Sequence, residues 1–325
     1  MGLSSSKPRL QNPTMLTVVE LFNFLCDFRY NFKIVDCRTS IEYIQSHIDT
    51  AIHVDDELSP VYMKTTSHVK ESLHKLDAII FYGDSAKSTA FAMLQRKVDQ
   101  KLMNLQVFEL NETFEIFKQQ FPFCCSNSDS YYPGMLYASK IDSRIYLSNL
   151  GVATNKAVLI NLGISHIVNC TVDGPYFDEL NPSNDTVSCI VVDPSQQEDS
   201  IIIAVSNTNK TKVKDISELI PSQNRYRVPV VDDADQNIQD YFHTTCLFIT
   251  SALSESPNHN VLIHCKHGQS RSATIAAAWL IATYKYDSGE AIRHLKKCRP
   301  RVGPNAGFLE QLRRWETSFL RLETS

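Results

Sequence analysis

The stretch Val261-Leu-Ile-His-Cys-Lys-His-Gly-Gln-Ser-Arg-Ser272 joins two apolar segments of different character. The residues from Val261 to His264 have the pattern of a buried strand, and Ala273 to Tyr284 has that of an apolar helix. A loop between such a strand and such a helix lies at the carboxyl edge of a parallel sheet, where ligands bind. The stretch therefore predicts an α/β fold with a ligand-binding loop.

The residue types in this loop indicate that the ligand is a phosphate group. Backbone N–H groups of the loop and the start of the helix point toward one site and favour an anion there. Five residues separate Cys265 from Arg271, so the loop can bring a thiolate and a planar guanidinium to the same anion. This environment favours the nucleophilic thiolate, although the pKa of a free cysteine is about 8.5.

The other residues of the loop have predicted supporting roles. Gly268 is expected to allow a tight turn with no Cβ facing the phosphate, and the Ser272 hydroxyl to donate to the sulfur when sulfur leaves. His264 is expected to support the nucleophile. The predicted phosphate-binding residues are Lys266, His267, Gly268, Gln269, Ser270 and Arg271. A structural cysteine beside a polar turn is the alternative for each residue alone, but the joint pattern favours catalysis.

The second half of the chain alternates strands and helices. Its predicted elements are strands at Ile145–Leu147, Ile164–Cys170, Tyr226–Val231 and Val261–His264, and a helix at Ala153–Leu162. Residues 172–227 are rich in Asn, Ser, Asp and Lys, and we expect them to be largely a mobile surface insertion. Only Cys189–Val192 and Ile201–Val205 resemble strands within that insertion.

The first half alternates in the same way, which predicts a mostly parallel sheet with helices on both faces. Capping boxes at Thr17–Glu20 and Thr39–Glu42 predict two helix starts. The other predicted elements are extended segments at Phe32–Val35, Ala51–Val54, Ala78–Tyr82 and Leu105–Leu110, and helices at Val61–Leu76, Ala86–Val98 and Thr113–Gln120. Phe121–Pro133 has the composition of a linker.

Several segments of the second half resemble the dual-specificity phosphatases, a family of cysteine-dependent protein tyrosine phosphatases. In family order they are Ile145–Asn149, Leu162–Thr171, Val228–Asp232, Ser272–Ile275 and Arg301–Phe308, followed by Gln311, Leu312 and Trp315. The resemblance covers about Pro133 to Leu322 apart from the insertion. It implies an α/β phosphatase domain with Asp232 as general acid. Asp233 and Asp235 are neighbours, and an acidic surface loop is the alternative.

Residues 14–122 resemble a rhodanese-like domain. The similar segments are Ile34–Arg38, Glu42-Tyr43, Ser46–Ile48 and Ala51–Val54. Active sulfurtransferases place a nucleophilic cysteine in the loop after the central strand, where this chain has Gly83 and Asp84. The resemblance therefore implies a non-catalytic domain rather than a sulfurtransferase. Cys37 is expected to be a packed thiol.

A non-catalytic rhodanese-like domain before a dual-specificity domain is the arrangement of the mitogen-activated protein kinase phosphatases. In those enzymes the first domain binds the kinase through a cluster of Arg residues. This chain has Asp55-Asp-Glu57 after His53-Val54, and then only the scattered Lys64, Lys70 and Lys75. Kinase docking is therefore left open, and a solvated helix face is the default interpretation of the lysines.

The expected function is a protein-tyrosine/serine/threonine phosphatase that uses a cysteinyl-phosphate intermediate and needs no metal or cofactor. Its partner is a phosphorylated protein, with a MAP kinase as one candidate. A phosphoprotein-binding scaffold with little turnover is the alternative. The expected organisation is an N-terminal tail (1–13), a rhodanese-like domain (14–122), a linker (123–134) and a phosphatase domain (135–325).

Composition restricts the partners and the compartment. The 325 residues carry a net charge of −4 and no basic block, so nucleic-acid binding is not expected. Nine dispersed Cys without a CxxC pair indicate a reducing compartment, hence the cytoplasm, with nuclear and membrane-associated fractions left open. Gly2 in Met1-Gly-Leu-Ser-Ser-Ser6 fits N-myristoylation, which alone gives transient membrane binding; a disordered tail is the alternative.

Overall fold

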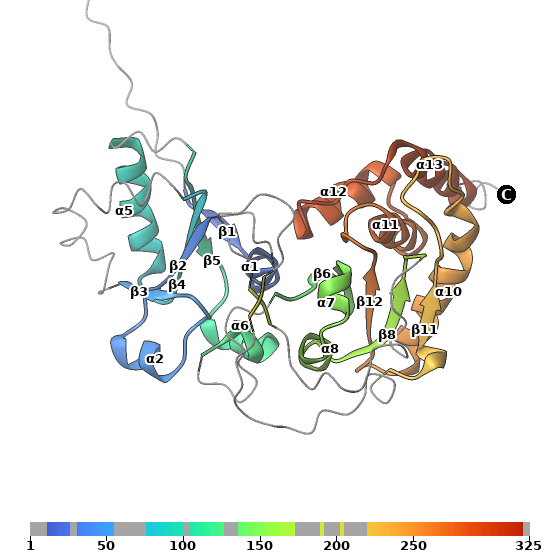
Figure 1. The fold of residues 1–325 in the computed structure, drawn as a ribbon. Coiled ribbons are helices and arrows are strands. Elements are labelled where there is room, and N and C mark those ends of the chain that lie inside the picture. The colour runs from blue at the N-terminus through green and yellow to red at the C-terminus, as the bar shows by residue number, and fades with distance from the viewer. Residues whose placement is uncertain are drawn as a thin grey trace, which may run out of the picture. The chain divides into compact units, whose positions relative to one another are not determined.

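The computed structural model describes residues 12–26, 31–54, 76–99, 104–126, 136–172, 189–191, 202–204 and 220–320 (Figure 1). The chain divides into two compact units, residues 1–133 and 134–325, and each is described by itself. Gly2 and all but the last residue of the helix expected at Val61–Leu76 lie outside the described residues. Within the described ranges, no helix combines the length and apolar character that a membrane span requires.

The first unit is built on a parallel sheet. Its strands are β1 (Thr14–Leu16), β2 (Phe32–Asp36), β3 (Ile52–His53), β4 (Ala78–Tyr82) and β5 (Gln106–Leu110), in the order β1-β5-β4-β2-β3. All residues of the central strand β4 are buried, as expected for a parallel sheet covered on both faces. The predicted strands are confirmed. Sequence reasoning missed β1, because three residues are too few to show a strand pattern.

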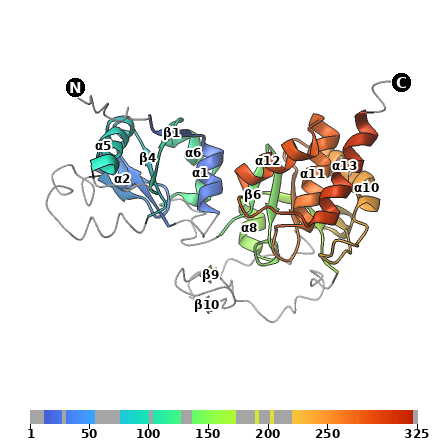
Figure 2. The ribbon, with the colours of Figure 1, turned by 90° about the horizontal axis from the view of Figure 1, so that it is seen from above.

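Helices cover both faces of this sheet. They are α1 (Val18–Leu25), α2 (Ser40–Gln45), α5 (Ala86–Asp99) and α6 (Phe114–Gln120). Figures 1 and 2 show α5 on one side of the sheet and α1 with α6 on the other. Both predicted capping boxes are confirmed: the Thr17 and Thr39 side chains accept backbone N–H groups, and Glu20 and Glu42 reach back to the caps.

The linker expected after α6 begins later than predicted. Phe121 stacks on Phe22 with ring centroids 4.2 Å apart, and the 3-10 helix η2 (Pro122–Cys124) follows. Cys125 then forms a β-bridge with Ile48. The assignment of the linker to residues 123–134 was therefore wrong for its first residues, because their apolar side chains are buried in the first unit.

The second unit contains a sheet with the strand order β11-β8-β12-β7-β6. The strands are β6 (Ser139–Asp142), β7 (Ile145–Ser148), β8 (Ile164–Asn169), β11 (Arg225–Arg227) and β12 (Asn260–His264). All neighbouring pairs are parallel except β6 and β7. The carboxyl ends of β8 and β12 therefore lie together, at the edge where the sequence predicts the phosphate loop.

Three predictions for this unit need correction. The helix expected at Ala153–Leu162 is two short helices, α7 (Leu150–Ala153) and α8 (Lys156–Asn161), because the Asn155 side chain caps a new start. The strand expected at Tyr226–Val231 is β11 alone, since Pro229 has no N–H to donate to a ladder.

The third correction concerns the insertion expected at residues 172–227. Its end was placed too late, because Ile220 is buried and β11 pairs with β8. The two strands predicted inside the insertion are confirmed: β9 (Cys189–Val191) and β10 (Ile202–Ala204) form an antiparallel pair. The remaining residues between 173 and 219 lie outside the described part of the chain.

The helices of the second unit surround one buried helix. They are α10 (Phe242–Glu255), α11 (Arg271–Tyr284), α12 (Ser288–Cys298) and α13 (Ala306–Leu320), and α10, α12 and α13 all contact α11 (Figure 2). Residues 271–281 are buried without interruption, which explains the apolar run in the sequence. This packing fixes the start of α11, and with it the end of the phosphate loop.

Candidate active site

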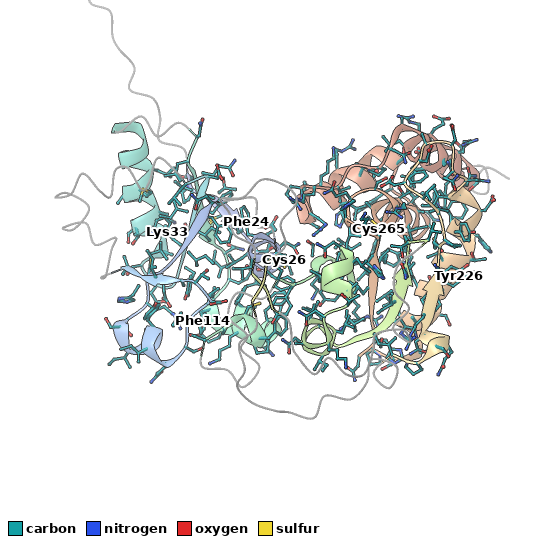
Figure 3. The ribbon with its side chains drawn as sticks, in the orientation of Figure 1. Phe24, Cys26, Lys33, Phe114, Tyr226 and Cys265 are labelled. Atoms are coloured by element: carbon teal, nitrogen blue, oxygen red, sulfur yellow. The ribbon has the colours of Figure 1, made fainter. Side chains whose placement is uncertain are left out.

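The predicted nucleophile lies at the junction of β12 and α11 (Figure 3). The Cys265 side chain is buried, and its Sγ accepts two hydrogen bonds. The donors are the backbone N–H of Gly268 at 3.1 Å and the hydroxyl of Ser272 at 3.2 Å. The structure therefore brings the nucleophile, the glycine and the serine of the predicted motif together around one sulfur atom.

These contacts change the acidity of the thiol. Burial by itself raises the pKa of Cys265, but the Ser272 side chain and the backbone N–H groups of Ser272 and Gln269 lower it. The guanidinium of Arg271 lowers it further, and the net shift of the pKa is downward. The site thus favours the thiolate, which is the nucleophilic form of cysteine.

Four consecutive carbonyl groups of the loop, those of residues 266–269, accept hydrogen bonds from other segments of the chain. The Lys266 carbonyl accepts from Leu150 N–H at 3.2 Å, and that of Gln269 accepts from Gly303 N–H at 3.0 Å. Arg299 donates to the carbonyls of His267 at 3.4 Å and Gly268 at 2.9 Å. With four consecutive carbonyls directed outward, the loop is left with its amides for an anion at its centre. The side chains of Lys266 and His267 are exposed.

Gly268 is required for a reason different from the one expected. Its φ is +68°, and a Cβ on it would lie 2.5 Å from the carbonyl carbon and oxygen of Ser148. The expectation that the Cβ would face the phosphate was therefore wrong. The loop packs against the end of β7, and only a glycine fits both the left-handed conformation and that close approach.

Arg271 and His264 flank the nucleophile in different ways. The buried Arg271 donates to the Val230 carbonyl at 3.2 Å, and its Nε lies 3.9 Å from Asp232 Oδ2. Burial lowers the pKa of His264 to about 4, so its ring is neutral at pH 7. The His264 carbonyl accepts from Cys170 N–H at 2.8 Å, which connects the end of β12 to the chain after β8.

The three aspartates of the acidic loop have different positions. Asp232 Oδ1 accepts hydrogen bonds from Ser270 Oγ at 2.6 Å and from Asn305 Nδ2 at 3.1 Å. Asp233 instead accepts from the backbone N–H of Asp235 and shapes the turn. Asp232 is therefore the aspartate that contacts the phosphate loop, and its role as general acid stays a prediction.

Three residues that support the site were not assigned a role from sequence. Asn305 positions Asp232, and Arg299 holds the loop carbonyls. Gly307 allows α13 to approach the acidic loop, since a Cβ there would lie 1.9 Å from the Ala234 carbonyl oxygen. Asn305 and Gly307 lie in the segment Arg301–Phe308, which sequence analysis singled out only as a resemblance. Their contacts join segments far apart in the chain, so no local pattern reveals them.

Comparison with known proteins places this site in a family. The model of the dual specificity phosphatase catalytic domain matches residues 188–318, and that of the rhodanese-like domain matches residues 27–120. Dual specificity protein phosphatase 1 of Arabidopsis thaliana is 34% identical over 180 residues, which cover 55% of this chain and 69% of that protein. The chain belongs to the dual specificity phosphatases.

Other members of the family match over different lengths. Tyrosine-protein phosphatase yvh1 of Schizosaccharomyces pombe is 40% identical over 94 residues, which are 29% of this chain and 28% of that protein. Human dual specificity protein phosphatase 16 is 26% identical over 302 residues, covering 87% of this chain and 40% of that protein. The chain thus spans less than half the length of these two relatives. The crystal structure of human DUSP28 has 20% identity and a TM-score of 0.41, covering 58% of this chain and 97% of that one.

Two features of the rhodanese-like domain of this dual specificity phosphatase bear on its chemistry: the loop after β4 and the thiol of Cys37. The loop after its central strand β4 begins Gly83-Asp84-Ser85, without a thiol. Cys37 is buried, as expected, and burial raises its pKa to about 12, so it is a protonated thiol at neutral pH. The segment with Asp55-Asp-Glu57 and the lysines considered for kinase docking lies outside the described residues.

Proposed function

We propose that this protein hydrolyses phosphate monoesters of tyrosine and of serine or threonine in proteins. The observation that carries the proposal is the joint position of three groups. The Cys265 sulfur accepts two hydrogen bonds, Arg271 starts the adjoining helix, and Asp232 is bonded to the same loop. A nucleophile, a guanidinium for the phosphoryl oxygens and an acid are the groups that the two-step reaction needs.

In the first step, the Cys265 thiolate attacks phosphorus and the bond from phosphorus to the ester oxygen breaks. Arg271 and the loop amides stabilise the charge on the other phosphoryl oxygens. Asp232 gives its proton to the departing oxygen, which leaves as a neutral alcohol or phenol. The products of this step are a cysteinyl phosphate and the Asp232 carboxylate.

In the second step, the Asp232 carboxylate removes a proton from water, and the resulting oxygen attacks phosphorus. The bond between phosphorus and sulfur breaks and inorganic phosphate leaves. The Ser272 hydroxyl, 3.2 Å from Sγ, stabilises the negative charge that returns to the sulfur. The thiolate and the protonated acid are then ready for another cycle.

A scaffold with little turnover is the second candidate function. It would be favoured if the insertion held Asp232 away from the phosphate loop. Asp232 instead bonds Ser270 and Asn305, so the described geometry supports turnover. Hydrolysis of an aryl phosphate in the presence of EDTA distinguishes the two. We expect phosphate release by the wild type and by the control Cys298→Ser, and none by Cys265→Ser. Equal rates for the wild type and Cys265→Ser would rule out the proposed reaction.

A MAP kinase is the substrate that we propose to test first. The support is the order of the two domains, a rhodanese-like domain before the phosphatase domain, over which the chain aligns with human dual specificity protein phosphatase 16. The Asp232→Ala/Cys265→Ser chain should retain a doubly phosphorylated MAP kinase more strongly than its unphosphorylated form. Equal retention of both forms would exclude the kinase as a substrate recognised by its phosphates.

Myristoylation of Gly2 and a cytoplasmic location with transient membrane association are further proposals. Their support is the sequence Met1-Gly-Leu-Ser-Ser-Ser6, without a second acylation signal nearby. Mass spectrometry of the N-terminal peptide from expressing cells tests the acylation, and fractionation of the same cells into cytosol and membranes tests the location. The acyl group should be present on the wild type and lost in Gly2→Ala, and an unmodified wild-type peptide would exclude it.

A further inference from the structure

Two histidines and a glutamate meet at the end of the sheet opposite the phosphate loop. His166 lies in β8, Glu255 is the last residue of α10, and His259 lies just before β12. One ring nitrogen of each histidine and one carboxylate oxygen all lie within 4.8 Å of one another. The Glu255 Oε2 atom is 3.9 Å from His166 Nε2 and 3.8 Å from His259 Nδ1.

The hydrogen bonds of Ser165 favour one tautomer of His166. The Ser165 hydroxyl has one proton, which it donates to the Asn260 carbonyl at 3.2 Å, and its oxygen accepts from Asn260 N–H at 3.1 Å. The same oxygen is 2.9 Å from His166 Nδ1. With the hydroxyl proton on the Asn260 carbonyl, this oxygen accepts from Nδ1–H, and the lone pair of Nε2 is on the side of Glu255.

His259 has a similar outer contact. Its Nδ1 is 3.1 Å from the carbonyl oxygen of Ala252, which can only accept, so this nitrogen carries a proton as well. Histidines that bind a metal almost always donate their other ring N–H to a carboxylate, a backbone carbonyl or water. Each histidine of the cluster therefore has an outer hydrogen-bond partner, Ser165 for His166 and Ala252 for His259, that can hold its ring in place.

The ligand atoms of the cluster are close enough together for one cation to contact all three residues. The lone pair of the buried His166 ring meets a carboxylate oxygen, and a second imidazole lies 5.0 Å away between ring centroids. A metal cation satisfies all three groups at once.

We propose that His166, Glu255 and His259 bind a divalent transition-metal ion, with Zn²⁺ as the ion that suits two imidazoles and one carboxylate. Ligand bonds of about 2.0–2.2 Å place tetrahedral donors roughly 3.4 Å apart, and His166 Nε2 lies 3.9 Å from Glu255 Oε2. Glu255 is exposed, so its side chain can move to shorten the distance from its carboxylate to the histidine nitrogens. Water can take the fourth position.

The ion would stabilise the fold and would take no part in phosphoryl transfer. It would join the end of α10 to the amino ends of β8 and β12, whereas Cys265 follows the carboxyl end of β12. The strand from Asn260 to Cys265 separates the two sites by roughly 16 Å. Removal of the ion with EDTA would therefore lower the melting temperature and leave the chemistry at Cys265 in place.

The experiment is a titration of Zn²⁺ into the full chain after removal of metals, by calorimetry and by thermal denaturation. We expect one site per chain and a higher melting temperature with Zn²⁺. His259→Gln and Glu255→Gln change partly exposed side chains. Each should weaken binding by at least 100-fold, since loss of a group that only hydrogen-bonds a ligand costs about 10–100-fold. His243→Gln, an exposed histidine of α10, should bind as the wild type does.

Two further measurements test the assignment of the ligands. Ser165→Ala removes the acceptor for His166 Nδ1–H and should weaken Zn²⁺ binding by about 10-fold or more. Co²⁺ in the Cys265→Ser chain should give visible d–d bands without the near-ultraviolet charge-transfer band of a thiolate. Absence of a Zn²⁺ site, unchanged binding in His259→Gln and Glu255→Gln, or thiolate bands that show cysteine ligands would each overturn the proposal.

Discussion

The Ser270 hydroxyl donates a hydrogen bond of 2.6 Å to the carboxylate of Asp232, although 38 positions separate the two residues in the chain. Asn305 binds the same carboxylate oxygen and also donates its backbone N–H to Ser270 Oγ at 3.3 Å. The three residues form a closed triangle of contacts between the acidic loop, the phosphate loop and the start of α13. The proposed acid is therefore held against the phosphate loop by side chains from two other segments.

Loss of the Asn305 side chain should impair proton transfer by Asp232 without affecting substrate binding. Asn305→Ala removes one of two bonds to Asp232, so we expect kcat to fall by about 10-fold and KM to change little. Asp232→Asn should cost about 100-fold or more, since general acids contribute about 10²–10⁴-fold. Steady-state kinetics with an aryl phosphate measure both. A rise in KM with unchanged kcat would contradict a positioning role. Asn237→Ala, which changes an exposed residue of the same region, is the control.

Substitution of Gly268 should distort the phosphate loop. In Gly268→Ala the new Cβ meets the Ser148 carbonyl at 2.5 Å and the backbone remains at positive φ, so activity should fall by at least 100-fold and the melting temperature should drop. Gly303→Ala is the matched control, because its Cβ would meet only the Arg301 oxygen at 3.9 Å. Wild-type activity in Gly268→Ala would show that the loop tolerates the shift.

Removal of the Ser272 hydroxyl should change the pH dependence. The hydroxyl helps to lower the pKa of Cys265, so Ser272→Ala should raise it. The thiolate of the variant then forms only at higher pH. Iodoacetamide alkylates the thiolate, so the pH at which the alkylation rate increases should be higher in the variant than in the wild type. Ser251→Ala, an exposed serine of α10, should leave the profile unchanged. A profile that does not move, or that moves to the acidic side, would contradict the proposed contact.

Replacement of Arg299 should remove hydrogen bonds that hold the carbonyl groups of the phosphate loop. Arg299 donates to the carbonyls of Gly268 and His267 and to the Ser139 hydroxyl, a set of bonds that needs the planar guanidinium. We expect Arg299→Lys to keep the charge, lose the fork of bonds and reduce kcat/KM by about 10-fold. Arg313→Lys, at an exposed position of α13, is the comparison. Equal kcat/KM in both variants would show that the carbonyls need no such support.

Local sequence patterns predicted most of the elements, and the errors have physical causes. The capping boxes at Thr17 and Thr39 and the strand Ala78–Tyr82 were predicted correctly, because each depends on neighbouring residues or on a continuous apolar run. The linker at residues 123–134 was placed too early because Phe123 and Cys124 are buried by residues distant in the chain. The end of the insertion was misplaced because β11 is defined by its pairing with β8.

The sequence by itself was enough to propose the chemistry of the phosphate loop, since Cys265, Arg271 and Ser272 are separated by short distances along a strand end, a turn and a helix start. Only the tertiary structure decided which aspartate contacts that loop, which residues hold its carbonyls outward, and that His166, Glu255 and His259 share one corner of the sheet. Those contacts join segments tens of residues apart. Parallel strand order and helix packing bring such segments together, and no pattern of neighbouring residues reveals these contacts.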